Sequence, residues 1–145
     1  MLYQLDPRSH LHAVYLPRTS NMCSIRYATP PTGGLRWQMP LIPKTDRTVV
    51  DATSYGNICP QIPRPSQVGN WKPGPEESED CLTINVWSPS GINGKKPLPV
   101  MVWIHGGGYK MGDGRSDLSE FINRTDNSIV GVTIQYRVSS RIPRR

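Results

Sequence analysis

Residues 105–109 carry the clearest chemical signal of the sequence, because three consecutive glycines stand between a histidine and a tyrosine. Glycine accepts positive φ angles and lets backbone N–H groups come close to a ligand. An apolar run over residues 99–104 leads directly into these glycines. The pattern predicts a loop whose backbone N–H groups hydrogen-bond a developing negative charge on oxygen, which is an oxyanion hole. The residues concerned are His105, Gly106, Gly107, Gly108 and Tyr109.

Acyl transfer at such a loop also needs an activated nucleophile and a base. A serine nucleophile of this kind lies in a Gly-x-Ser-x-Gly elbow, and no such motif occurs in the 145 residues. The nearest approach is residues 114–118, which lack the second glycine. We therefore interpret Ser116 as the N-cap of a short helix. His105 is interpreted as a brace for the glycine loop, not as a base.

Two other chemistries fit the sequence less well. A phosphate-binding loop needs Gly-Lys-Ser/Thr at the start of a helix, and the residues after Lys110 do not supply it. His10 and His12 have the spacing of metal ligands, but no second ligand cluster accompanies them. The sequence therefore predicts neither a metal nor another cofactor.

The elements that would position the glycine loop follow from hydrophobic periodicity. Residues 82–88 alternate, as expected of a strand with one buried face, and residues 129–136 form another largely apolar strand. Between residues 99–104 and 129–136, a short helix is expected in which Leu118, Phe121 and Ile122 share a face. This strand–helix–strand unit predicts a parallel sheet covered on both faces. Residues 1–23 show neither periodicity, and residues 40–80 are mostly irregular.

Composition and charge narrow the class of protein. The chain has 15 prolines and 36% hydrophobic residues, which favours one domain with long loops. Its net charge is +6, but the basic excess lies near the two ends and forms no stripe, so nucleic-acid binding is not expected. No apolar run reaches the ~18 residues of a membrane span, and the N-terminus lacks the apolar region of a signal peptide.

The three cysteines and one glycosylation sequon do not determine the cellular compartment of the protein. Cys59 and Cys81 flank a loop rich in proline and glycine and are the natural pair, with Cys23 left over. Free thiols in a reducing compartment are the alternative. Asn123 begins an Asn-Arg-Thr glycosylation sequon, which would suit a secreted protein but is also a common chance match. The localisation and the redox state of Cys23 are therefore not predicted.

Four segments together resemble one protein family. Residues 25–37, 78–87, 100–109 and 132–138 are similar, in order and spacing, to the N-terminal part of the type B carboxylesterase/lipase family. This α/β-hydrolase group includes fungal lipases, carboxylesterases and cholinesterases. The resemblance implies an α/β class and the N-terminal portion of an α/β-hydrolase fold, mostly strands and loops with one βαβ unit and an incomplete sheet. It covers residues 24–138, with an unassigned segment 1–23 and a divergent basic tail 139–145.

The resemblance also implies roles for particular residues. The amides of Gly107 and Gly108 would be two of three oxyanion donors, the third being the amide after the serine. Cys59 and Cys81 would form the family's first disulfide, and Arg36 and Glu79 would form a buried ion pair. Trp71 would correspond to the cationic-site tryptophan of cholinesterases. Two exposed charges are the alternative for the ion pair, and ordinary loop packing is the alternative for the tryptophan.

The function implied is hydrolysis of a small-molecule carboxylic ester by a serine mechanism without a cofactor. The serine, the acid and the histidine of the family would lie beyond residue 145. We therefore expect a truncated fragment that is inactive alone and, with its apolar strands uncovered, is not a stable monomer. A non-catalytic interaction protein of the same family is the alternative. Neither the substrate nor the oligomeric state is predicted.

Overall fold

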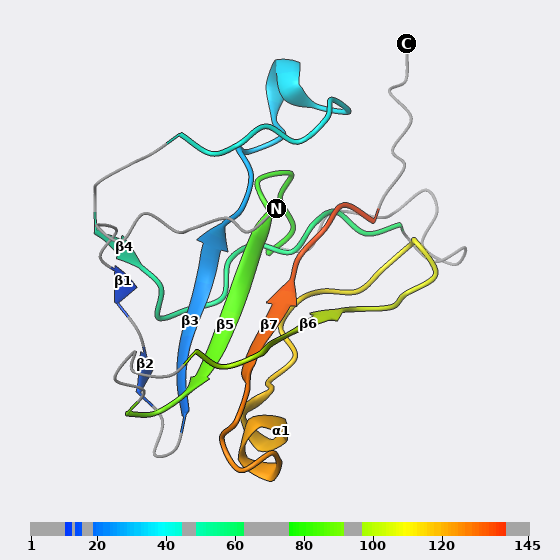
Figure 1. Ribbon diagram of the computed structural model, residues 1–145. Coiled ribbons are helices and arrows are strands. Elements are labelled where there is room, and N and C mark those ends of the chain that lie inside the picture. Colours follow the sequence, from blue (N-terminus) through cyan, green and yellow to red (C-terminus); the bar gives the residue numbers. More distant parts are fainter. Residues whose placement is uncertain are drawn as a thin grey trace.

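The computed structural model describes residues 11–12, 14–15, 19–44, 49–62, 76–91 and 97–138. Trp71 and the expected basic tail lie outside these ranges. The described residues hold one sheet of five strands in the order β2-β3-β5-β7-β6, which Figure 1 shows with β6 at one margin. The strands are β2 (Val14–Tyr15), β3 (Thr19–Arg26), β5 (Thr83–Pro89), β7 (Val130–Ile134) and β6 (Val100–Ile104).

The sheet is mixed, so the predicted parallel sheet is wrong for most of its pairs. Only β6 and β7 run parallel, whereas β2–β3, β3–β5 and β5–β7 are antiparallel. The parallel pair is the one joined by the predicted crossover helix, α1 (Ser119–Arg124). A parallel pair needs such a crossover, and the antiparallel pairs do not. The three predicted strands each lie within two residues of an observed one.

The N-terminal segment contains strands that its sequence pattern did not predict. Strand β3, which has eight residues, begins at Thr19. Strand β1 (Leu11–His12) pairs in parallel with β4 (Val50–Asp51). The register of β3 against β5 shifts between Met22 and Ile25, where Ser24 has a φ of 59°. A bulge of this kind breaks the two-residue alternation by which a strand is recognised. A short 3₁₀ helix, η1 (Gly33–Leu35), follows.

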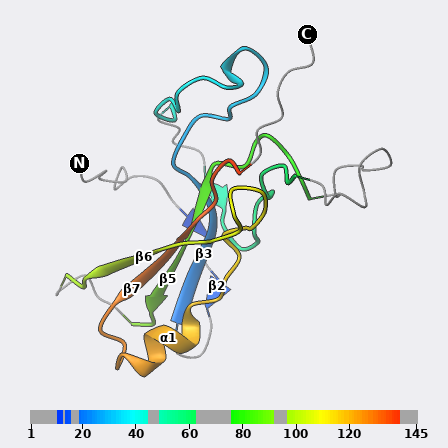
Figure 2. The same ribbon diagram turned by 90° about the vertical axis from the view of Figure 1, so that its right-hand side faces the viewer.

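Strand β5 alternates as predicted, but its more polar side is the buried one. Thr83, Asn85 and Trp87 are buried, while Ile84 and Val86 are half-exposed. Trp87 packs against α1 through Leu118 and Ile122, and Figure 2 shows this helix at one end of the sheet. The helix and the loop before it therefore cover the side of the sheet on which Asn85 and Trp87 lie.

Two expectations about α1 are wrong. The helix begins at Ser119 with Leu118 as its N-cap and no side-chain cap, so Ser116 does not cap it. The backbone N–H of Ser119 instead donates to the Asp117 carboxylate at 2.8 Å. Phe121 is 49% exposed and does not share the buried face. A helix of six residues has room for only a narrow contact stripe, and that stripe contains Ile122.

The opposite face of the sheet is apolar and open. The strand registers place Ile84, Ile134 and Ile104 in one row across β5, β7 and β6. Val86, Val132 and Val102 form the next row. The predicted burial of β6 is wrong, because Val102 and Ile104 are 52% and 66% exposed. Within the described ranges, no helix has the length and apolarity needed to cross a bilayer.

Candidate active-site loop

The glycine loop directly follows β6 and turns back sharply. Gly107 and Gly108 have φ angles of 136° and 61°, and Tyr109 also has a positive φ of 61°. The amides of Lys110 and Met111 both donate to the Gly107 carbonyl, at 3.1 and 3.3 Å. Within the described part of the chain, the amides of Gly107 and Gly108 donate to no protein group, and both residues are exposed. The loop therefore offers two adjacent, unpaired N–H donors.

The loop backbone approaches itself closely at two positions, Gly107 and Gly112, and both positions require glycine. A Cβ on Gly107 would lie 1.7 Å from the Met111 carbonyl oxygen. A Cβ on Gly112 would lie 2.3 Å from Nδ1 of His105 and 2.4 Å from the Gly106 oxygen. Real Cβ atoms do not approach other atoms so closely, so a side chain at either position would displace the loop. No atom lies within 4 Å of the corresponding point on Gly106.

His105 braces the start of the loop. Its side chain is buried, and its Nδ1 lies 2.8 Å from the Gly106 carbonyl oxygen. The imidazole stacks on the ring of Tyr136 with centroids 4.2 Å apart, and the Tyr136 hydroxyl donates to the His105 carbonyl. The sequence pattern did not single out Tyr136. The one signal for Tyr136 was its position as the aromatic residue at the end of the strand predicted over residues 129–136.

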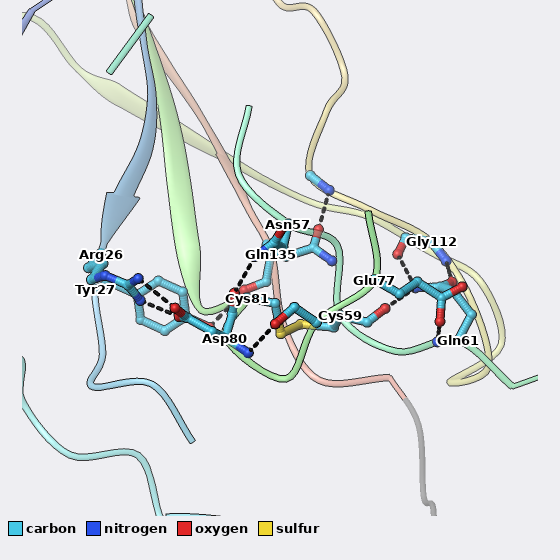
Figure 3. Close-up of a disulfide and its surroundings, with 12 residues drawn as sticks. Arg26, Tyr27, Asn57, Cys59, Gln61, Glu77, Asp80, Cys81, Gly112 and Gln135 are labelled. Carbon is cyan, nitrogen blue, oxygen red and sulfur yellow. Dashed lines mark hydrogen bonds and ion pairs between the residues drawn. A yellow bond between two sulfur atoms is a disulfide. The ribbon is translucent and has the colours of Figure 1, made fainter. Parts of the chain in front are cut away.

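Gln61 joins the glycine loop to the disulfide, and the sequence pattern missed it. Its Oε1 accepts from the amide of Gly112 at 2.7 Å, and its Nε2 lies 3.2 Å from the Gly112 carbonyl oxygen. Nε2 also donates to the Cys59 carbonyl at 2.6 Å. Figure 3 shows Gln61 reaching across to Gly112 with Glu77 beside it. Its place two residues after Cys59 was the one signal in the sequence.

The predicted disulfide between Cys59 and Cys81 is confirmed. The two residues are 22 positions apart, and both are fully buried (Figure 3). Cys23 is a buried free cysteine on β3, and burial raises the pKa of its thiol. The bridge therefore links covalently the two chain segments that contain Cys59 and Cys81.

The structure brings Arg36 and Glu79 together but does not bury them. Nε of Arg36 lies 2.5 Å from Oε1 of Glu79, and each side chain is 37% exposed. The expected buried pair is therefore a partly solvated one. The Arg36 guanidinium also lies 5.4 Å from the centroid of the Trp37 ring. Arg36, Trp37 and Glu79 line one pocket together with the two cysteines of the disulfide.

Buried amides hold the segment that connects the loop to α1. Nδ2 of Asn85 donates to the Gly114 carbonyl at 2.7 Å, and Oε1 of Gln135 accepts from the Gly114 amide at 2.6 Å. A Cβ on Gly114 would lie 2.9 Å from the Ile134 carbonyl carbon. Asn85 and Gln135 come from β5 and the residue after β7, so the sheet itself positions this segment.

The remaining predicted site residues are Tyr109 and Asn123. Tyr109 ends the glycine loop, and its side chain is 91% exposed. Asn123 lies near the end of α1 and is partly buried, and the hydroxyl of Thr125 in its sequon donates to the Ile122 carbonyl at 2.8 Å. Across the described ranges, no three His, Cys, Asp or Glu side chains gather as metal ligands.

Comparison with known proteins identifies the family. A model of the carboxylesterase family matches residues 18–140. Para-nitrobenzyl esterase of Bacillus subtilis is 41% identical over 115 residues, which cover 79% of this chain and 23% of the esterase. Acetylcholinesterase of Bungarus fasciatus is 38% identical over 128 residues, 83% of this chain and 21% of that enzyme.

The fold agrees with this assignment. The crystal structure of Aspergillus niger EstA superposes with a TM-score of 0.81 at 34% identity, covering 92% of this chain and 25% of EstA. This chain therefore spans about a quarter of the length of these relatives or less. Its mixed sheet and crossover helix correspond to a portion of an α/β-hydrolase. The chain belongs to the carboxylesterase family.

Proposed function

We propose that this chain supplies the oxyanion-hole segment of a serine-type carboxylic-ester hydrolase that acts on small-molecule esters. The observation that carries the proposal is the pair of unpaired N–H donors of Gly107 and Gly108, in a chain of the carboxylesterase family. When a serine attacks an ester carbonyl, the carbonyl oxygen becomes an anion in the tetrahedral intermediate. Two amides held in place before the reaction stabilise that charge without reorganising.

We further propose that these 145 residues do not hydrolyse esters by themselves. They contain no Gly-x-Ser-x-Gly sequence, and their histidines are His10, His12 and His105. The imidazole of His105 is stacked on Tyr136 and engaged at the Gly106 carbonyl, which is the environment of a structural residue. The loop then contributes only when a nucleophile and a base stand opposite it.

A segment exchange tests the proposed role. The matching segment of the Bacillus subtilis para-nitrobenzyl esterase is replaced by residues 24–138 of this chain, and hydrolysis of a p-nitrophenyl ester is followed. The hybrid is expected to turn over the ester, because it combines this loop with the host's remaining residues. Gly107→Ala keeps the backbone N–H, but its Cβ would meet the Met111 carbonyl and displace the loop. Because the Gly107 amide would then point away from the oxyanion, kcat in the hybrid should fall by about 100- to 1,000-fold, as when one oxyanion donor is lost.

The controls separate the role of the loop from folding. Gly106→Ala is the matched variant, because space is open around that position, and it should keep kcat within about threefold. A folded hybrid without esterase activity, or equal losses in the two variants, would contradict the oxyanion role. Inhibitor-sensitive ester hydrolysis by the 145-residue chain alone would contradict its proposed inactivity.

A further inference from the structure

The Gln61 side-chain amide hydrogen-bonds both the backbone N–H and the backbone carbonyl of Gly112. Its amide oxygen accepts from the Gly112 N–H at 2.7 Å, and its amide nitrogen lies 3.2 Å from the Gly112 carbonyl oxygen. One position further along the chain, the backbone N–H of Ile62 donates to the Lys110 carbonyl at 2.8 Å. Three hydrogen bonds thus tie this short segment to the far end of the glycine loop. No other described side chain bonds Gly112.

Fixing Gly112 also fixes the donor end of the loop, because the two ends are in contact. The space where a Cβ of Gly112 would stand is bounded by His105 Nδ1 and by the Gly106 oxygen. The corresponding space at Gly107 is filled by the Met111 carbonyl. A shift of Gly112 by a fraction of an ångström would therefore be passed to Gly106 and Gly107 through packed backbone.

Gln61 is in turn held by the disulfide segment. Its amide nitrogen donates to the Cys59 carbonyl at 2.6 Å, and its backbone N–H donates to the Glu77 carboxylate at 3.2 Å. Cys59 and Cys81 are fully buried, and Glu77 lies on the same stretch as Cys81 (Figure 3). The disulfide thus links covalently the two chain segments that hydrogen-bond Gln61.

We propose that Gln61 is a positioning residue that couples the Cys59–Cys81 disulfide to the glycine loop and so sets the geometry of the Gly107 and Gly108 amides. The catalytic meaning of that geometry rests on the proposed function above. Gln61 itself touches none of the reacting atoms in this scheme. It acts through Gly112, and the disulfide acts through Gln61.

The test reads the loop directly in the full 145-residue chain. The glycines are labelled with a nitrogen isotope, and NMR gives the resonance position and exchange rate of each glycine amide. In the unmodified chain, the Gly112 amide should be protected and the unpaired Gly107 and Gly108 amides should exchange fast. Gln61→Ala should speed exchange at Gly112 by about tenfold or more, the equivalent of one lost hydrogen bond. The Gly106 and Gly107 resonances should shift as well.

Two internal references separate positioning from general destabilisation. The amides of Gly114 and Gly131 are held by Gln135 and by β7, so they should not change in Gln61→Ala. Gln38→Ala is the matched control, because Gln38 is exposed and its described hydrogen bonds use the backbone alone. Equal acceleration at all glycines would overturn the proposal, and so would an unprotected Gly112 in an unmodified chain whose Gly114 and Gly131 amides are protected.

Reduction of the disulfide tests the coupling. Reducing the unmodified chain should speed exchange at Gly112 by about tenfold, whereas reducing the Gln61→Ala variant should add no more than about twofold, because coupled perturbations are not additive. The same acceleration in both chains would show that the disulfide does not act through Gln61. None of these readouts requires ester hydrolysis, so a failure here is distinct from a failure of the segment exchange.

Discussion

At the scale of single residues, the glycine loop contains positions with different demands. Gly107 combines a φ of 136° with a carbonyl oxygen 1.7 Å from the place of a Cβ. Gly106 has open space there. The three glycines look equivalent in the sequence, yet only some of them are required by the backbone path. Conformation and close approach, not the run of glycines as such, decide which substitutions the loop tolerates.

The first prediction compares these two positions in the chain itself. Gly107→Ala should lower the free energy of unfolding by about 1–3 kcal/mol, because the new methyl group forces strained backbone to move. Gly106→Ala should change it by less than about 0.5 kcal/mol. Urea unfolding followed by tryptophan fluorescence measures both. A Gly107→Ala variant as stable as the Gly106→Ala variant would show that the loop adapts freely.

At the scale of elements, α1 is attached to the sheet by very few side chains. Ile122 is fully buried and packs with Leu118 against Trp87 of β5. Phe121 stands next to Ile122 in the sequence but is 49% exposed. A six-residue helix gains little from its own hydrogen bonds, so its stability depends on this packing.

The second prediction therefore contrasts neighbours on one helix. Ile122→Ala should lower the free energy of unfolding by about 2–5 kcal/mol, since it leaves a cavity against Trp87. Phe121→Ala should cost less than about 1 kcal/mol, because much of the ring already contacts water. Chemical denaturation of the two variants gives the comparison. Similar losses in both would mean that Phe121 is packed against the protein in solution.

At the scale of the whole molecule, one face of the sheet is covered and the other is open. The rows of isoleucine and valine across β5, β7 and β6 meet solvent, and Val102 and Ile104 of β6 are 52% and 66% exposed. Residues 100–104 contain no charge and no proline. Such an edge strand lacks the features by which proteins discourage pairing between chains. The chain is therefore expected to associate with itself.

The third prediction concerns this open face. The native chain should enhance the fluorescence of the hydrophobic dye ANS, and its apparent mass in light scattering should rise with concentration. The double substitution Val102→Thr and Ile104→Thr should weaken both effects by removing apolar area from the face. Leu41→Ser is the control, because Leu41 is 51% exposed and lies outside the strands of the sheet. An equal reduction by Leu41→Ser would refute the assignment of the association surface.

Local pattern was sufficient to predict the strands at residues 82–88, 99–104 and 129–136, because their periodicity is carried by consecutive side chains. It also predicted the glycine loop and favoured the pairing of Cys59 with Cys81, which the family resemblance implied as a disulfide. It failed at β3, where a bulge hides the alternation, and at Ser116, where the Asp117 carboxylate takes the place expected for a capping hydroxyl. The burial of Arg36 and Glu79 was also wrong, since exposure depends on what surrounds a pair.

The sequence by itself determined the family, the glycine loop that would carry the chemistry and the disulfide partners, because each is encoded in residue type and spacing along the chain. The tertiary structure decided which residues hold that loop. Gln61 and Tyr136 reach it from 51 and 31 positions away. It also decided that the buried side of β5 carries Thr83 and Asn85. Hydrogen bonds between distant segments and the covering of a sheet face are properties of the folded chain, so no local pattern encodes them.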